Sequence, residues 1–265
     1  MDKEFTYQSS KIFYRVEGTG QTLFLIHGFA EDHSIWEYQV SALKKDFQLI
    51  IPDLPGSGKS PYHPGFSSLE DFADCIRVIA EREQRAGFAL VGHSMGGYVT
   101  LAFGEKYPDR LSGIGLFHST AFPDTEEKKS ARRKSIEFIN QHGSAPFIRQ
   151  SVRNLFSDPF KKKFPDEVSE IVERFSQFDP RSLVRYYETM IIRPDRTRVL
   201  QNFHGPVLFI IGEQDKAVPL EDSLHQCHLP LRAHIHILED AAHMGMLEDP
   251  AGSTEKLADF MKALY

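Results

Sequence analysis

Short apolar runs of strand length recur along the chain, and most of them contain few polar residues. An unbroken apolar run of this kind is typical of a parallel strand that is buried on both faces of a sheet. Six such runs are Thr22–Gly28, Phe47–Asp53, Phe88–Ser94, Ser112–Ser119, Pro206–Asp215 and Ala233–Asp240. Two further runs, Phe5–Tyr7 and Lys11–Val16, predict two strands joined by a tight turn at Ser9-Ser10.

The segments between these runs carry apolar residues every three or four positions, which is the spacing of an amphipathic helix. The clearest stripes are Leu69, Phe72, Ala73, Ile76 and Ile79, and then Leu257, Phe260, Met261 and Leu264. Strands that alternate with helices predict a doubly wound α/β sheet, in which functional residues gather at the carboxyl ends of the strands. We therefore expect the functional side chains in the loops that follow the predicted strands.

The stretch from residue 120 to residue 202 interrupts this alternation, because it contains helix-like segments and prolines but no convincing strand. A helical insertion between two core strands is expected to cover the functional edge as a lid. The sequence therefore predicts a core formed by residues 1–119 and 203–265 and a helical cap formed by residues 120–202.

The chain has 265 residues, and its 31 Lys+Arg against 37 Asp+Glu give a net charge of −6, which provides no general attraction for nucleic acid. No apolar run reaches the roughly 18 residues that span a membrane, and the charged N-terminus does not resemble a secretory signal. Cys75 and Cys227 are too few for a disulfide framework. We expect a soluble, cytoplasmic protein with no nucleic-acid or membrane partner. No feature of the sequence indicates an oligomeric state.

The sharpest motif is Gly92-His93-Ser94-Met95-Gly96, which directly follows a predicted strand and precedes a helical run. This is the G-x-S-x-G pattern of a nucleophile elbow, a strand–helix turn that exposes a serine hydroxyl. The residues two before and two after the serine must be very small, and Gly92 and Gly96 meet this need. The sequence therefore predicts Ser94 as a nucleophile at the N-terminus of a helix, where the helix dipole favours a developing anion.

A serine hydroxyl needs a neighbouring base, and histidine suits this role because its ordinary pKa lies near neutrality. His243 is the predicted base, because it lies in a loop between the last predicted strand and the last predicted helix. His27, His93 and His118 also lie at strand ends, but each adjoins a turn where a buried, hydrogen-bonded structural role is more common.

The carboxylate that orients this histidine should follow a strand between the serine and the histidine in the chain. Asp215 follows such a strand and is the predicted orienting residue. Asp124, after the sixth predicted strand, is the main alternative. Glu213 and Asp240 are also near, but both could instead cap helices or lie on the surface.

Acyl transfer also needs hydrogen-bond donors aimed at the oxyanion of the tetrahedral intermediate. The backbone N–H of Met95, next to the nucleophile, is one expected donor, and the backbone N–H of Phe29 is the other. Phe29 lies in the loop after the third predicted strand, where Gly28 permits a close turn. Candidates for lining an acyl pocket are Trp36, Phe122, Phe147 and Met190, although ordinary packing would account for each.

Two other kinds of site are excluded by spacing. The segment Gly56–Ser60 looks like a phosphate-binding loop, but that pattern requires a glycine where Asp53 stands. The histidines show no H-E-x-x-H spacing and the cysteines no C-x-x-C spacing, so we expect no catalytic metal.

In these motifs the chain resembles the α/β-hydrolase superfamily over nearly its whole length. The matching segments are His27–Phe29, Asp53–Ser60, Gly92–Gly97, Gly212–Asp215 and the loop around His243. The resemblance implies an α/β-hydrolase fold with an eight-stranded, mostly parallel sheet, helices on both faces and a helical cap after the sixth strand. It also implies a cofactor-independent serine hydrolase that forms an acyl-enzyme.

The serine at the elbow reduces the number of activities that the resemblance implies. Epoxide hydrolases and haloalkane dehalogenases resemble this chain but use an aspartate at the elbow. Esterases, lactonases, thioesterases, carbon–carbon bond hydrolases and haloperoxidase-like members keep the serine, and a carboxylesterase-type activity on an ester of small to medium size is expected as the commonest of these. The menaquinone-synthesis enzyme of the superfamily is also similar, but it usually has an arginine after S-M-G-G, where this sequence has Tyr98. A non-catalytic, ligand-binding protein on the same fold is the alternative of another class.

Overall fold

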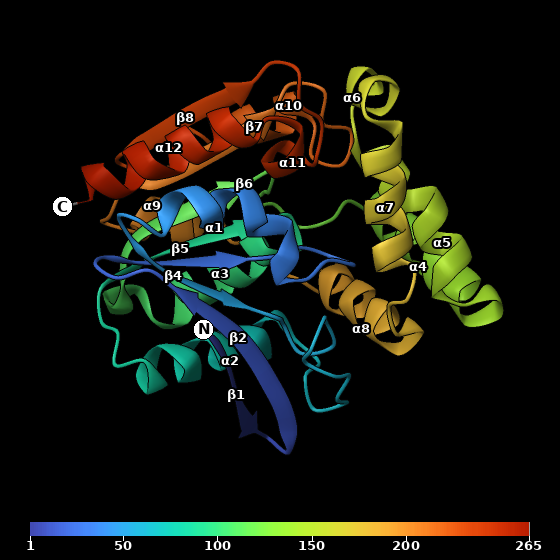
Figure 1. Cartoon of the computed structure of the whole chain (residues 1–265), viewed down its shortest axis with the longest axis horizontal. Coiled ribbons are helices and arrows are strands. Elements are labelled where there is room, and N and C mark those ends of the chain that lie inside the picture. Colours follow the sequence, from blue (N-terminus) through green and yellow to red (C-terminus); the bar gives the residue numbers. More distant parts are fainter. Residues whose placement is uncertain (265) are drawn as a thin grey trace.

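The computed structural model describes residues 1–264, which form one eight-stranded sheet with the strand order β1-β2-β4-β3-β5-β6-β7-β8 (Figure 1). The strands are β1 (Asp2–Tyr7), β2 (Ser10–Glu17), β3 (Thr22–Ile26), β4 (Gln48–Pro52), β5 (Phe88–His93), β6 (Leu111–Phe117), β7 (Val207–Gly212) and β8 (Ala233–Leu238). The pairings β1–β2 and β2–β4 are antiparallel, and all the other pairings are parallel. The eight predicted strands and the mostly parallel sheet are confirmed.

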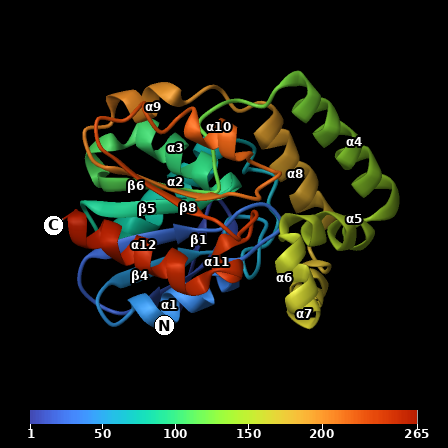
Figure 2. The same cartoon turned by 90° about the horizontal axis from the view of Figure 1, so that it is seen from above.

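Helices cover both faces of the sheet. Helices α2 (Leu69–Arg82) and α3 (Met95–Lys106) lie on one face, and α1 (Glu37–Leu43) and α12 (Pro250–Ala263) lie on the other (Figure 2). In β3, Phe24 packs with the α2–α3 side of the core and Leu25 with the α1–α12 side. Successive side chains of a strand point to opposite faces, so an unbroken apolar run fills both layers of the core. Shorter core elements are η1 (His33–Trp36), η2 (Pro108–Arg110), α10 (Leu220–Leu224) and α11 (Gly245–Glu248).

The edge strand β8 departs from the prediction, which expected its run to be buried on both faces. Its side chains alternate, and Ile235 and Ile237 are each 44% exposed. On the opposite face, the His234 ring lies 5.6 Å from the ring of Phe260 in α12. The expectation of two buried faces is therefore wrong for β8, because a strand at the edge of a sheet has fewer neighbours to cover it.

A group of helices follows β6 and stands beyond the sheet on one side of the molecule (Figures 1 and 2). These cap elements are α4 (Glu126–His142), α5 (Ser144–Ser151), η3 (Val152–Leu155), α6 (Asp158–Lys163), α7 (Pro165–Phe175) and α8 (Pro180–Ile191). Helix α9 (Thr197–Asn202), within the stretch predicted as cap, instead lies against α3, where Val199 approaches Gly104. Within residues 1–264, no helix is both long enough and apolar enough to cross a membrane.

Candidate active site

Ser94 forms the turn between β5 and α3 with φ of 49° and ψ of −116°. This backbone conformation costs a residue with a side chain about 1–3 kcal/mol, and such strain persists where the surrounding structure enforces it. The surroundings here are very tight. A Cβ atom on Gly92 would lie 2.1 Å from the Gly96 backbone, and one on Gly96 would lie 2.4 Å from the Ile26 carbonyl oxygen. The sharp strand–helix turn therefore requires both glycines that the sequence places around Ser94.

Asp215 and His243 meet at the same edge of the sheet, in the loops after β7 and β8. Nδ1 of His243 lies 2.7 Å from Oδ2 of Asp215, and both side chains are buried. The other oxygen of Asp215, Oδ1, accepts the backbone N–H groups of Ala217 at 2.8 Å and Val218 at 3.0 Å. Burial raises the pKa of Asp215, but the neighbouring histidine rings, His243 first, lower it more, so this pKa lies well below its ordinary value. The pair is thus a carboxylate and an imidazole in fixed orientation.

The cap holds the loop that carries His243. The backbone N–H of His243 donates to the carbonyl oxygen of Leu155 in η3 at 2.9 Å. The Glu248 carboxylate accepts the backbone N–H of Met244 at 3.1 Å through one oxygen and that of Ser157, in the cap, at 2.8 Å through the other. The backbone on either side of the imidazole is therefore fixed partly by residues of the cap.

The loop after β3 lies directly against Ser94. A Cβ atom on Gly28 would lie 3.1 Å from the Ser94 Cβ. His27 accepts the Leu54 N–H at its Nε2 (3.0 Å), so its Nδ1 carries the proton and donates to the Gly28 carbonyl oxygen (2.8 Å). In a planar trans peptide the C=O and N–H point opposite ways, so the Phe29 N–H points away from His27.

The two expected oxyanion donors are both available. Within residues 1–264, neither the Phe29 N–H nor the Met95 N–H has a hydrogen-bond partner. Met95 begins α3, and the first N–H groups of a helix have no partner within the helix, so its N–H is available to an anion. Both N–H groups belong to the residues that the sequence analysis expects to supply the oxyanion donors.

His118, at the end of β6, contacts the same aspartate but is not a second base. Its Nδ1 accepts the Gly212 N–H at 2.9 Å, so that nitrogen carries no proton and cannot donate to Asp215, whose Oδ2 lies 3.5 Å away. Burial lowers the pKa of His118 to about 4, despite the neighbouring carboxylate. The ring is therefore neutral, in keeping with the structural role expected for it.

The four candidates for an acyl pocket occupy different places. Trp36 is fully enclosed in the core, with its ring 5.3 Å from that of Phe117, and does not line a pocket. Met190 is buried in the core cluster, and Phe122 is half-buried. Phe147 lies against the loop that follows β3, with its ring 6.3 Å from that of Phe29.

Sequence reasoning missed Tyr187 of α8, whose ring stacks on the Phe29 ring with centroids 4.3 Å apart. Nothing in the local sequence of α8 distinguishes this tyrosine from its neighbour Tyr186, since their separate roles arise only when the cap packs on the core. Together with Phe147, it places aromatic surface from the cap over the loop that follows β3.

The other carboxylates weighed for the orienting role lie elsewhere. Glu213 and Asp240 are exposed. Asp124 is fully buried and lies between two guanidinium groups, 2.6 Å from Nε of Arg132 and 2.9 Å from Nη1 of Arg193. Burial raises the pKa of Asp124, but the two arginines lower it further, to below its ordinary value. Asp124 therefore connects the start of the cap to its end. Of the four carboxylates weighed for the orienting role, Asp215 alone is bonded to His243.

Replacing Asp124 by asparagine should lower the free energy of unfolding by about 3–5 kcal/mol, because the buried Arg193 and the partly buried Arg132 lose their counter-charge. Urea unfolding followed by circular dichroism measures this change. The matched control is Asp222→Asn, which removes an exposed partner of Lys128 and should change stability by less than about 0.5 kcal/mol. Equal effects of the two substitutions would mean that the buried cluster does not stabilise the fold.

A mostly parallel sheet with a cap after its sixth strand and a strained serine turn after its fifth is the architecture of an α/β hydrolase. The model of the alpha/beta hydrolase fold family matches residues 21–250, so the chain belongs to this family.

Its relatives include several hydrolases at low identity. An uncharacterised hydrolase of Bacillus subtilis, YugF, is 25% identical, with 98% of this chain and 97% of that protein covered. The pimeloyl-[acyl-carrier protein] methyl ester esterase of Vibrio cholerae is 24% identical, with 94% and 97% covered. A thermophilic esterase from Thermogutta terrifontis, solved with malate bound, has a TM-score of 0.93 at 28% identity, with 100% of this chain and 99% of that chain covered.

Proposed function

We propose that the protein is a serine hydrolase that cleaves a carboxylic ester of small to medium size, with Ser94, His243 and Asp215 as its catalytic triad. The observation that carries the proposal is the buried hydrogen bond of 2.7 Å between His243 and Asp215, at the sheet edge where Ser94 occupies its strained turn. A nucleophile, a base and a group that orients the base are the parts that acyl transfer requires.

In the proposed mechanism Ser94 Oγ attacks the ester carbonyl carbon while Nε2 of His243 takes its proton. The Asp215 carboxylate keeps the proton of the neutral ring on Nδ1 and stabilises the imidazolium that forms. The N–H groups of Phe29 and Met95 donate to the oxyanion. His243 then protonates the departing alcohol, and a water molecule activated by the same ring releases the acid from Ser94.

The ester as substrate is supported by relatives that are named as esterases, one in Vibrio cholerae and one in Thermogutta terrifontis. Lactonase, thioesterase and carbon–carbon bond hydrolase activities use the same residues and remain alternatives, as does the lyase reaction of menaquinone synthesis, which Tyr98 disfavours. A non-catalytic ligand receptor is the alternative of another class. We also propose that the protein is soluble and cytoplasmic and that it works without a cofactor.

A fluorophosphonate probe and a panel of p-nitrophenyl esters with short and medium acyl chains test the proposal. The wild-type protein should be labelled at Ser94 and should hydrolyse at least one ester of the panel. A lactone and a thioester of matching acyl length, assayed in parallel, separate the alternative hydrolase activities. Failure to label together with no turnover of any substrate would instead favour the receptor.

The pH dependence of ester hydrolysis should reflect His243. Burial lowers the pKa of His243, but the Asp215 carboxylate, with Glu31 and Glu248, raises it, and the result lies above the ordinary value of 6.5. The base must be unprotonated, so kcat/KM should rise with pH through a midpoint above 6.5 and then level off. Rates measured from about pH 5 to about pH 9 locate this midpoint. A midpoint below the ordinary histidine value would contradict this assignment of the base.

A further inference from the structure

A buried carboxylate, Glu31, belongs to the loop that follows β3 (residues 27–33, here called the oxyanion loop) and contacts His93 of the elbow, and the proposed mechanism does not use it. Its side chain is almost fully buried. Its Oε2 accepts the backbone N–H of Gly28 at 2.6 Å and lies 2.9 Å from Nδ1 of His93, which has no exposed surface. The other ring nitrogen of His93, Nε2, lies 2.8 Å from the carbonyl oxygen of His243. One continuous chain of hydrogen bonds therefore links Gly28 to the backbone of the proposed base.

The hydrogen-bond partners indicate which groups donate along this chain. The His243 carbonyl can only accept, so Nε2 of His93 carries a proton. Burial raises the pKa of Glu31, but His93 and the Gly28 N–H lower it further, to below its ordinary value, so Glu31 is ionised. An ionised carboxylate also only accepts, so Nδ1 of His93 donates to it. The His93 ring thus joins the Glu31 carboxylate to the His243 carbonyl oxygen through two buried hydrogen bonds.

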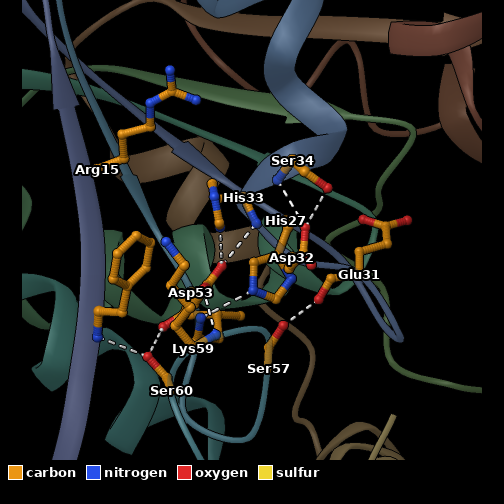
Figure 3. A network of polar contacts seen from close by, with 12 residues as sticks. Arg15, His27, Glu31, Asp32, His33, Ser34, Asp53, Ser57, Lys59 and Ser60 are labelled. Atoms are coloured by element: carbon orange, nitrogen blue, oxygen red, sulfur yellow. Dashed lines mark hydrogen bonds and ion pairs between the residues drawn. The ribbon is translucent and has the colours of Figure 1, made fainter. Parts of the chain in front are cut away.

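The backbone of Glu31 is itself anchored by the segment that follows β4. The Ser57 hydroxyl donates to the Glu31 carbonyl oxygen (Figure 3). The buried Asp53 carboxylate accepts the N–H of His33 at 2.9 Å and the N–H of Lys59 at 2.8 Å, which joins the segment after β4 to the oxyanion loop. A Cβ atom on Gly58, where φ is 49°, would lie 2.3 Å from an oxygen of Asp53.

The segment Gly56–Ser60, which looks like a phosphate-binding loop, therefore has a different use. Gly58 makes room for the Asp53 carboxylate, and the Ser57 hydroxyl holds the loop that carries Glu31. The Ser60 hydroxyl donates to the Asp53 carbonyl oxygen at 2.9 Å.

We propose that Glu31 is a positioning residue, which through His93 sets the place of the oxyanion donor relative to the catalytic base. This inference rests on the proposed function. Glu31 holds the N–H of Gly28, the residue before Phe29, and His93 holds the carbonyl oxygen of His243. The loop that bears the oxyanion donor and the loop that bears the base therefore share one rigid link. The Gly28 carbonyl is held by His27, and its N–H by Glu31, so neither peptide that flanks Gly28 can rotate freely.

Loosening this link should affect the transition state more than the bound substrate. The oxyanion forms only during reaction, so a misplaced donor lowers kcat and leaves KM nearly unchanged. Complete loss of one oxyanion donor costs roughly 10²–10³-fold in kcat. We expect Glu31→Gln, which keeps an acceptor but removes the charge, to lower kcat about tenfold, and Glu31→Leu, which removes both bonds, to lower it about 100-fold.

The test measures kcat and KM for an ester that the wild-type protein hydrolyses, together with the inhibition constant of a trifluoromethyl ketone. This inhibitor forms an oxyanion on the serine, so its affinity should fall in parallel with kcat, which a merely structural role would not require. Glu37→Gln, which alters an exposed carboxylate that begins α1, is the matched control and should leave both quantities unchanged. Wild-type kcat in folded Glu31→Gln and Glu31→Leu, or a rise in KM alone, would overturn the proposal.

Amide hydrogen exchange keeps the two proposals distinguishable. In Glu31→Gln, exchange should become faster both in residues 27–30 and in residues 242–244, because one link holds both loops. If the wild-type protein is neither labelled nor active but both loops respond, the proposed function fails and the link stands. If the second loop does not respond, the link through His93 is overturned, whatever the activity.

Discussion

Replacing Ser94 by alanine should abolish ester hydrolysis, with a loss in kcat of about 10⁶-fold, similar to the loss when the serine of another hydrolase triad is removed. The substitution deletes only the hydroxyl oxygen that attacks the ester. Alanine keeps the Cβ atom, so the strained φ of 49° and the tight contacts of the turn should persist. The expected result is therefore an inactive protein that unfolds at the same temperature as the wild-type protein and no longer reacts with a fluorophosphonate.

Ser130 supplies the control for this experiment, because it is an exposed serine in cap helix α4. Ser130→Ala should keep the wild-type rate and the wild-type labelling. Residual hydrolysis by Ser94→Ala above about a thousandth of the wild-type rate would show that another group is the nucleophile.

The second large effect is expected for Asp215→Asn, at about 10⁴-fold in kcat. The position of Oδ1 explains why. That oxygen accepts two backbone N–H groups, from Ala217 and Val218, so the amide oxygen of asparagine must take its place. The amino group then faces Nδ1 of His243, which must accept a hydrogen bond and lose its proton to Nε2. In that tautomer Nε2 cannot take the proton from Ser94.

The carboxylate Glu213 tests whether charge alone explains this loss, since it is exposed and close in sequence to Asp215. Glu213→Gln removes the same charge and should leave kcat unchanged. The Asp215→Asn protein should also lose activity without losing its fold, as measured by circular dichroism. A loss in kcat of less than about tenfold would mean that Asp215 does not orient the base.

The sequence predicted those features that depend on neighbours in the chain. The apolar runs determine the strands, because each strand fills both layers of the core with its own alternating side chains. The turn at Ser94 could be predicted because the two glycines that it requires, Gly92 and Gly96, lie only two residues before and two residues after the serine. The prediction failed for β8, since its run resembles those of the inner strands and only its position at the edge exposes Ile235 and Ile237.

The link from Glu31 through His93 could not be predicted in this way. His93 contacts Glu31 across 62 positions of the chain and the carbonyl of His243 across 150 positions. In the sequence Glu31 is simply an acidic residue in a loop, and its almost complete burial is the signal that distinguishes it. The contact between Tyr187 and Phe29 likewise depends on how the cap packs on the core.

The hydrogen bond from the His243 N–H to the Leu155 carbonyl has a consequence for the order of events during turnover. If η3 swings outward to admit an ester or to discharge an acid, His243 loses this acceptor and Ser157 leaves Glu248. The loop that bears the imidazole is then supported only from the core side. In such an open state the proposed base would be held less firmly, so we expect the proposed proton transfer only while Leu155 stays bonded to His243.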